Sequence, residues 1–384
     1  MSGPQEKVDV AVVGLGFGED FLPVYRAHPL VGEIAVVETS GERLDAVADR
    51  HSIAHRYTDF HEMLADERWR AVHVLAPVRF HADYAVAALE AGRHVACAVP
   101  MATELADVER VVRAQEAAGT VYTMMETAVY GREYRLVQRL HDQGRLGDLT
   151  MFRGFHLQNL DGYPGYWQGY PPMKYATHAL APLLALTGSQ VETVTALGTG
   201  RLTPERLGEY DNPFPAEVGV FRLAGSDVAG VVQLSFFQTA RTYVEGFDVY
   251  GQHGGVEWPL EDGDPLRVYD LQPLAPDMPS TGLRGRRSTV ELVEPDDHPG
   301  DLTPELVPFL REVAMPPAAD GSEEVRRAEH GGAHPYLVDA FVRAAATGRQ
   351  PWVDARRSAA WTAPGICAHE SALAGGVPVQ VPQY

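Results

Sequence analysis

Cysteine, basic charge and long apolar runs are all scarce in this chain of 384 residues. Its two cysteines, Cys97 and Cys367, belong to no spaced Cys/His set, so no metal site is predicted, and lone thiols are typical of a reducing compartment. The formal net charge of −20 argues against nucleic acid and membranes as partners, because both bind basic surfaces. No stretch approaches the roughly 18 apolar residues of a membrane span, and residues 1–10 lack a signal-peptide core. We therefore expect a soluble cytoplasmic protein.

The chain is longer than one hydrophobic core usually serves, so two domains are expected. In the first 125 residues, short apolar runs alternate with helical patterns. The runs predict strands over 8–16, 33–40, 71–77, 94–100 and 121–126. Helices are predicted from residue 21 and over 41–52, 81–92 and 104–119. Strands that are apolar on both faces and joined by such helices indicate a parallel sheet of βαβ units.

Beyond residue 125 strands follow one another with few helices between them. Helical patterns cover 130–144 and 174–188, and strand patterns cover 191–200, 217–225, 228–240 and 243–258. This succession favours an antiparallel sheet. Residues 261–332 are rich in Pro, Asp and Glu and are expected to form a long surface excursion. The chain then returns to helix over 335–348 and 358–376.

A glycine-rich segment joins the first predicted strand to the first helix, which is the context of a dinucleotide-binding turn. Gly14 permits the tight turn, and Gly16 lets the backbone approach a pyrophosphate at the helix N-terminus. Glu38 ends the second strand, where an acid binds the ribose hydroxyls and repels the 2′-phosphate of NADP. Glu19 departs from the pattern, because a small residue is usual there, and Gly18 is expected to relieve the crowding. The segment predicts NAD binding; the alternative is a plain glycine-rich turn.

Four longer segments resemble the Gfo/Idh/MocA family of oxidoreductases: 74–102, 140–154, 177–188 and 334–354. The resemblance implies an α/β fold with an N-terminal Rossmann domain over 1–125. A C-terminal α/β domain over 126–384 would follow, with a large open, mostly antiparallel sheet, and the closing helices (333–375) would pack back on the Rossmann domain. Members bind NAD or NADP, act on sugars, cyclitols or related polyols, and form dimers or tetramers.

The resemblance also places a Pro and a His beside the nicotinamide, and these match Pro77 and His81. For His81 a helix-opening role is the alternative. The full set of predicted cofactor-binding residues is Gly14, Gly16, Phe17, Gly18, Glu38, Pro77, His81 and Pro100.

Two departures from the family affect the predicted catalytic residues. The family's Glu-Lys-Pro triplet is replaced by Ala98, Val99 and Pro100, so its lysine is missing. On the substrate helix the family's His is matched by His178, but Lys174 stands where an Asp is usual. Residues four apart share a helix face, so we expect both side chains in the substrate cleft, with Lys174 reaching the volume left beside Val99. Desolvation would make Lys174 a base near neutral pH. The alternatives are a solvated lysine and a structural histidine.

Several other residues are candidate substrate contacts. The loop 159–175 is crowded with aromatic side chains, which pack on sugar rings; packing on the sheet or on another subunit is the alternative. Its candidates are Tyr163, Trp167 and Tyr175. Glu126 and Tyr130 follow the fifth predicted strand and would border the nicotinamide. His334 follows a pair of glycines before the closing helix and would cover the substrate, or would simply cap that helix.

The main hypothesis is therefore an NAD-dependent oxidoreductase that passes hydride between a carbohydrate-like polyol and nicotinamide, with Lys174 and His178 as proton acceptors. Two alternatives stay open. One is a redox-neutral enzyme with tightly bound NAD, either an epimerase or a lyase or glycosidase that oxidises, eliminates and reduces. The other is a catalytically silent NAD-binding protein. The face of the sheet carrying Val231, Leu234 and Phe236 is expected to meet another subunit.

Overall fold

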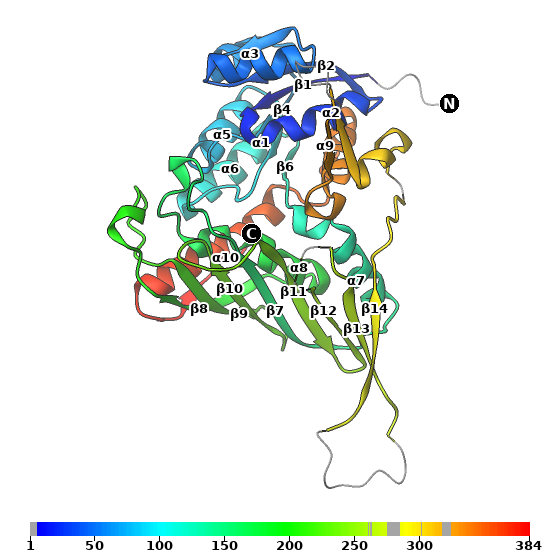
Figure 1. Cartoon of the computed structure of the whole chain (residues 1–384). Coiled ribbons are helices and arrows are strands. Elements are labelled where there is room, and N and C mark those ends of the chain that lie inside the picture. The colour runs from blue at the N-terminus through cyan, green and yellow to red at the C-terminus, as the bar shows by residue number, and fades with distance from the viewer. Residues whose placement is uncertain (1–5, 260, 262, 275–284, 301, 317–323) are drawn as a thin grey trace. The chain divides into compact units, whose positions relative to one another are not determined.

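The structure is a computed structural model that describes residues 6–259, 261, 263–274, 285–300, 302–316 and 324–384 (Figure 1). The chain forms two compact units. The first comprises residues 1–131, 297–366 and 384, and the second comprises 132–296 and 367–383. Helix α10 (Ala355–Leu373) contributes residues to both units. Among the described residues, no helix combines the length and the apolarity that crossing a membrane requires.

The first unit is built on a six-stranded parallel sheet with the strand order β3-β2-β1-β4-β5-β6. The strands are β1 (Val8–Val13), β2 (Val31–Val37), β3 (His55–Tyr57), β4 (Ala71–Val74), β5 (His94–Cys97) and β6 (Tyr122–Met124). In β1 nearly every residue is buried, as a strand covered on both faces requires. The sequence-based prediction of a parallel Rossmann sheet is confirmed.

Helices complete the first unit, and their ends carry ordinary capping signals. They are α1 (Leu15–Gly18), α2 (Leu22–Ala27), α3 (Gly41–Arg50), α4 (Phe60–Ala65), α5 (His81–Glu90), α6 (Leu105–Ala118) and α9 (His334–Thr347). The Ser40 hydroxyl accepts a hydrogen bond from the Arg43 backbone N–H at the start of α3. Gly119 ends α6 in the left-handed conformation. Helix α5 packs on α6, and α2 packs on α9 (Figure 1). Leu337 and Phe341 of α9 belong to the same core as β1.

Short elements join these helices and strands in the first unit. They are the 3-10 turns η1 (Glu19–Phe21), η2 (Val78–Phe80), η3 (Thr127–Val129), η7 (Pro304–Leu310) and η8 (His330–Gly332), and the two-stranded sheet of β15 (Glu312–Met315) and β16 (Glu324–Arg327). Residues 304–316 and 324–332 thus belong to the same unit as the parallel sheet.

The second unit is built on a nine-stranded sheet with the order β14-β13-β12-β11-β7-β10-β9-β8-β17. Only β7 and β10 pair in parallel, so the predicted large, mostly antiparallel sheet is confirmed. The strands are β7 (Leu149–Leu157), β8 (Val191–Thr199), β9 (Ala216–Leu223), β10 (Ala229–Ser235), β11 (Val244–Gly251), β12 (Gly254–Glu257), β13 (Leu266–Leu271), β14 (Ser288–Val293) and β17 (Val379–Gln380).

Helix α8 (Thr177–Thr187) lies across one face of this sheet, over β7, β10 and β11 (Figure 1). Two glycines permit the close approach. A Cβ at Gly154 would lie 1.9 Å from the Ala179 carbonyl oxygen, and one at Gly230 would lie 2.7 Å from a methyl of Leu183. The unit also contains α7 (Arg132–Asp142) and the 3-10 turns η4 (Gly165–Trp167), η5 (Pro172–Tyr175) and η6 (Pro204–Arg206).

Two sequence-based expectations about this unit are wrong. Val231, Leu234 and Phe236 do not share the open face, because strand side chains alternate. Leu234 is on the α8 side with Gly230 and is 1% exposed, and Phe236 follows the strand and is also 1% exposed. Residues 261–332 are not simply a surface excursion, since β13 and β14 extend the sheet; parts of the segment, such as 275–284 and 317–323, lie outside the described residues.

Candidate functional site

The glycine-rich turn of the first unit has the geometry that its sequence predicts. Gly14 has a φ of 91°, and a Cβ there would lie 2.6 Å from the Leu75 carbonyl oxygen. A Cβ at Gly18 would lie 3.0 Å from Cγ1 of Val12 and 3.3 Å from Cδ1 of Leu75. Gly18 therefore allows α1 to pack closely on β1 and β4, which is the role usually given to the third small residue of the motif.

The unusual Glu19 points to the end of α3. Its carboxylate lies 2.9 Å from Nη1 of Arg50 and 3.2 Å from Nε2 of His51. The hydrogen bond with His51 is the main cause that lowers the pKa of Glu19, so the carboxylate is ionised at neutral pH. The acid is thus an anchor for α3, and the turn keeps its close packing because Gly18 precedes it.

The protein leaves the space beside Gly16 free, because a Cβ at this position would come within 4 Å of one atom only, Nη1 of Arg43, at 4.0 Å. Nearby, the Glu38 carboxylate accepts hydrogen bonds from the backbone N–H groups of Leu15 and Ser40, each at 3.1 Å. Its side chain is 10% exposed and lies 3.7 Å from Nη1 of Arg43. An open glycine surface beside a fixed carboxylate at the end of β2 fits a dinucleotide. We infer that Gly14, Gly16, Phe17, Gly18 and Glu38 hold it.

His81 joins two loops that the sequence assigned to the nicotinamide end. Its Nδ1 lies 2.8 Å from the Pro100 carbonyl oxygen, and its Nε2 lies 2.9 Å from that of Ala76, next to Pro77. The ring is 2% exposed, and burial lowers its pKa, whereas the two contacts with carbonyl oxygens act in the opposite direction. Both ring nitrogens face protein carbonyls, which supports a positioning role for His81 on the loops of Pro77 and Pro100.

Phe17 belongs to a cluster of aromatic and imidazole rings. Its centroid is 5.3 Å from that of Phe21 and 5.5 Å from that of His334, and His334 stacks on Phe21 at 4.3 Å. Phe17 is 36% exposed, whereas His334 is buried, and burial lowers the pKa of His334 well below its usual value. His334 is therefore a neutral ring packed beneath the cofactor loop; a substrate contact for it stays a proposal.

Glu126 and Tyr130 lie at the end of β6. Glu126 is fully buried, and its Oε1 accepts a hydrogen bond from the Ala128 backbone N–H 3.0 Å away, so the carboxylate caps η3. The Tyr130 ring lies 6.0 Å from that of Trp352 in an edge contact. The cap gives Glu126 a structural role, and substrate contact by Glu126 and Tyr130 stays a prediction.

In the second unit, Lys174 and His178 do not lie on one α-helix, so that part of the prediction is wrong. Lys174 is in η5 and His178 is in α8, and Ala176 between them has φ −71° and ψ −7°. The turn η5 ends at Tyr175, and α8 begins at Thr177. Lys174 is half-buried and His178 is buried.

A buried carboxylate fixes the turn that carries Lys174. The Met173 backbone N–H donates to Oε2 of Glu217 at 2.7 Å, and Nδ1 of His369 lies 2.8 Å from Oε1 of the same carboxylate. Glu217 is fully buried and His369 is 3% exposed. The pair ties η5 to β9 and to the second-unit part of α10.

A second carboxylate, Glu245 of β11, joins two histidines. Nδ1 of His178 lies 3.9 Å from its Oε1, and Nδ1 of His156 on β7 lies 3.7 Å from its Oε2. The Tyr243 hydroxyl donates to Oε2 at 2.9 Å. We call His156, His178, Tyr243 and Glu245 the acid–base cluster. Sequence reasoning found only His178. An available signal was Glu245 in alternation with the apolar residues Phe247 and Val249 on one face of β11.

The aromatic loop surrounds this cluster. The Tyr175 ring lies 5.2 Å from that of His178, and Trp167 lies 5.4 Å from Tyr175. Tyr170 is fully buried and serves packing. Tyr163 is 49% exposed, and its hydroxyl accepts a hydrogen bond from Nε2 of Gln158 at 2.9 Å. The structure thus brings Trp167, Tyr175 and His178 together. In the described residues no group of three or more His, Cys, Asp or Glu side chains is arranged to hold a metal ion.

Comparison with known proteins agrees with both units. Residues 8–126 match the oxidoreductase family with an NAD-binding Rossmann fold, and residues 134–257 match the GFO/IDH/MocA C-terminal domain. A glycosyl hydrolase family 109 protein of Streptomyces coelicolor is 25% identical, over 98% of this chain and 83% of that protein. An inositol 2-dehydrogenase of Salmonella typhimurium is 32% identical, over 40% of this chain and 47% of that protein.

Among solved structures, levoglucosan dehydrogenase in complex with NADH and levoglucosan has the same fold. Its TM-score is 0.73 at 20% identity, and the match covers 98% of this chain and 100% of that one. This likeness shows the fold, and the two matched domains show the family of the chain and its cofactor class. The chain belongs to the Gfo/Idh/MocA family of NAD-binding oxidoreductases, which act on CH–OH groups.

Proposed function

We propose that the chain oxidises a sugar, cyclitol or related polyol, with the acid–base cluster accepting the proton of the reacting hydroxyl. The observation that carries this proposal is the Glu245 carboxylate beside His178, with Nδ1 and Oε1 3.9 Å apart. A carboxylate at this distance stabilises the imidazolium that forms when His178 takes a proton. Nδ1 of His178 is the ring nitrogen in this contact with Glu245, and Nε2 is the atom proposed to accept the proton of the substrate hydroxyl.

The other residues have supporting roles. Lys174 provides a second polar group on the neighbouring turn, and the hydrogen bond from Met173 to Glu217 fixes that turn. Trp167 and Tyr175 offer ring faces for the C–H side of a sugar. When bound, NAD supplies hydride acceptance at its nicotinamide ring. Lys174 and Val99 belong to different units, so replacement of the missing motif lysine by Lys174 stays a prediction.

The experiment is a screen of sugars and cyclitols with purified protein and NAD, followed by the absorbance of NADH. Steady NADH formation is expected with at least one neutral polyol. Lys174→Ala is expected to lower kcat without changing NAD affinity, by the 10²–10⁴-fold typical of acid–base groups. Lys174→Arg should restore little, because a guanidinium keeps its proton. If Lys174→Ala retains more than about a third of kcat, the lysine is not the base and His178 remains.

A redox-neutral glycosidase is the second candidate. It is favoured by the glycosyl hydrolase family 109 relative, whose similarity covers nearly the whole chain, whereas the inositol 2-dehydrogenase covers less than half of it. The same screen, extended to glycosides, separates the two. Sugar release without net NADH formation supports the glycosidase, and steady NADH formation supports the dehydrogenase.

Self-association and location complete the proposal. On the open face of the large sheet, exposed Leu197 and Val218 stand opposite each other on β8 and β9, with Val220 on the same face. We infer that this face meets a second copy of the chain, since exposed apolar strands of this kind mark contact surfaces. A monomer in light scattering would contradict it. The two buried free thiols, Cys97 and Cys367, are consistent with a cytoplasmic location.

A further inference from the structure

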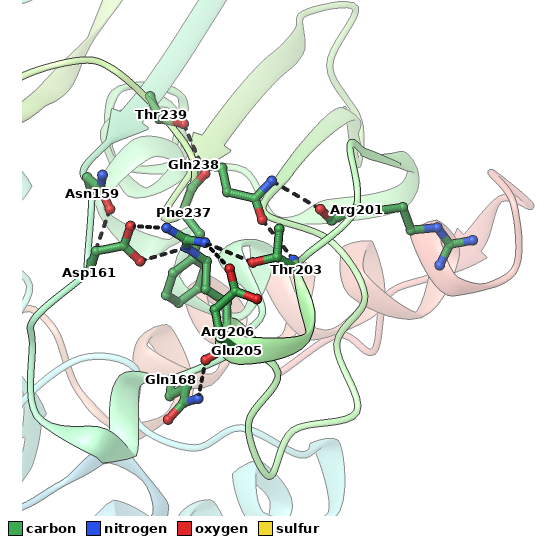
Figure 2. Close-up of polar contacts among 10 residues, drawn as sticks. All are labelled: Asn159, Asp161, Gln168, Arg201, Thr203, Glu205, Arg206, Phe237, Gln238 and Thr239. Atoms are coloured by element: carbon green, nitrogen blue, oxygen red, sulfur yellow. Dashed lines mark hydrogen bonds and ion pairs between the residues drawn. The ribbon is translucent and has the colours of Figure 1, made fainter.

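A cavity of about 220 Å³ opens in the second unit beside the aromatic loop. Its lining residues are Leu160, Asp161, Gly162, Tyr163, Gly165, Gln168, Glu205, Arg206 and Phe237. Figure 2 shows five of them: Asp161, Gln168, Glu205, Arg206 and Phe237. The acid–base cluster described above contributes none of these residues. A cavity of this size has the volume of a single sugar ring and needs its own explanation.

Arg206 is fixed in place before any ligand arrives. Nε and Nη2 donate to the two carboxylate oxygens of Asp161 at 2.8 and 2.7 Å. Nη1 donates to Oγ1 of Thr203 at 2.8 Å and to Oε1 of Glu205 at 3.1 Å (Figure 2). A guanidinium has five N–H groups, so these four bonds leave one N–H of Nη2 for a ligand. The site is therefore rigid, and it presents a single directed donor.

The remaining polar groups are mostly acceptors. The hydrogen bonds from Arg206 lower the pKa of Asp161, so its carboxylate is ionised and retains lone pairs for further donors. Gln168 uses both amide hydrogens on the carbonyl oxygens of Glu205 and Leu207, which leaves its Oε1 as an acceptor. The Tyr163 hydroxyl accepts from Gln158 and keeps its own hydrogen to donate.

The charge and the polar lining of the cavity then define the ligand class. Asp161 and Glu205 outweigh Arg206, so the cavity has a net negative charge and repels phosphates and carboxylates. Leu160 and Phe237 line it but are almost fully buried, so its accessible surface is mostly polar. Several acceptors and few donors around such a cavity suit a neutral ring with several hydroxyl groups.

A hydrogen-bonded chain joins this cavity to the acid–base cluster. Tyr163 on its wall is bonded to Gln158, and Oε1 of Gln158 lies 3.1 Å from Nε2 of His156. Phe237 follows Phe236, whose ring lies 5.0 Å from that of His156. The wall of the cavity and the acid–base cluster are therefore linked through Gln158 and His156 within the second unit.

We propose that this cavity is a subsite for an uncharged polyhydroxylated ring, namely the non-reacting part of a glycoside substrate. That the ring is part of a substrate rests on the function proposed above. That the cavity binds such a ring does not depend on that function. With this subsite the enzyme would prefer a two-ring substrate to the single sugar. The preference would appear as a lower KM with little change in kcat, because the ring bound in the subsite takes no part in the reaction.

Gly165 gives a direct way to close the cavity. It lines the wall, and a Cβ there would meet no protein atom within 4 Å, so Gly165→Leu adds bulk without a clash. Arg206→Ala removes the donor. The matched control is Arg145→Ala, because Arg145 makes the same two-bond contact with Asp270, 2.8 and 2.6 Å long, outside the cavity.

The measurement is binding of glucose, glucose 6-phosphate and glucuronate at millimolar concentration, by saturation-transfer NMR on the full chain. Glucose should bind the wild type, His178→Ala and Arg145→Ala equally and should bind Gly165→Leu and Arg206→Ala about tenfold more weakly or not at all. Both anions should bind about tenfold more weakly than glucose. Circular dichroism checks that each variant is folded.

Three results would overturn the subsite: no glucose binding to the wild type, glucose binding unaffected by Gly165→Leu, or anions binding as well as glucose. Loss of glucose binding in His178→Ala alone would also overturn it, by placing the ring at the acid–base cluster. If glucose binds as expected but no polyol or glycoside is turned over, the proposed function fails and the subsite stands.

Discussion

Two groups of buried histidines have different surroundings. In the first unit His73, His81 and His334 contact carbonyl oxygens, a tyrosine hydroxyl or aromatic rings, and burial is the main cause that lowers the pKa of each, to about 3 for His73. In the second unit His156 and His178 face the carboxylate of Glu245. A carboxylate beside an imidazole favours its protonated form, so we propose the second group as the site of proton transfer.

Removing the paired histidine should have the largest effect. His178→Ala is expected to lower kcat by the 10²–10⁴-fold typical of a general base, with NAD affinity unchanged. Glu245→Gln keeps the shape but removes the charge beside the ring, so it should also lower kcat, and the double variant should lose little more than His178→Ala. Stopped-flow NADH formation measures the first, and calorimetry measures NAD affinity.

A matched control is His253→Ala, since His253 is an exposed histidine of the same unit. Its kcat should equal that of the wild type. If the losses from His178→Ala and Glu245→Gln simply multiply in the double variant, the two side chains act independently and the paired assignment is wrong.

The lowered pKa of His334 should make the free energy of unfolding depend on pH. An unfolded histidine takes up its proton near pH 6.5, whereas His334 takes one up only at much lower pH. Between these values the unfolded state binds more protons, so the free energy of unfolding decreases as the pH falls, by up to about 1.4 kcal/mol per pH unit. His334→Phe, which can keep the stacking on Phe21, should lose that part of the slope.

Urea unfolding at pH 7 and pH 5 measures this difference. Relative to the wild type, His334→Phe should become more stable by about 1–2 kcal/mol on going from the higher to the lower pH. His61→Phe is the control, because His61 is exposed and should show no such trend. A trend equal in both variants would mean that burial does not hold His334 neutral.

Substitutions of two glycines in α1 should affect different properties, one the stability of the first unit and the other its affinity for NAD. In Gly18→Ala the new methyl lies 3.0 Å from Val12, so the variant should lose about 1–3 kcal/mol of unfolding free energy. In Gly16→Ala the methyl meets only Arg43, at 4.0 Å, so stability should hold while NAD affinity falls. Thermal unfolding with and without NAD checks both. Equal destabilisation would contradict the different roles given to these glycines.

A site can be predicted from the sequence when its residues lie close together along the chain, and not when sheet pairing brings them together. The cofactor turn is a single strand–turn–helix segment, so the need for glycine at positions 14 and 18 follows from a local pattern, and a Cβ at either would lie close to neighbouring atoms. Cofactor contact at Gly14, Gly16 and Gly18 stays a prediction. The acid–base cluster is different. His156 and Glu245 stand opposite each other only because of the register of β7 and β11, which no local pattern specifies. That pairing depends on sheet topology.

Two further predictions were wrong. The spacing of Lys174 and His178 predicts one helix face, but the 3-10 turn η5 ends at Tyr175 and α8 begins at Thr177. Leu234 and Val231 are predicted on the same open face, although an odd spacing puts two strand residues on opposite faces. The second error was avoidable from the sequence, because the alternation of side chains along a strand is a local rule.

The smallest effect concerns cofactor choice. The carboxylate of Glu38 lies at the end of β2, where it would repel the 2′-phosphate of NADP, and Arg43 lies 3.7 Å from it. We expect the wild type to prefer NAD by about tenfold, or about 1.4 kcal/mol. Glu38→Gln retains an acceptor for the Leu15 N–H but removes the charge, which leaves Arg43 to face the phosphate. NADP affinity should then rise by about tenfold, and adding Arg43→Ala should cancel the gain. Calorimetric titration of both cofactors measures these changes; equal wild-type affinities would show that Glu38 does not select the cofactor.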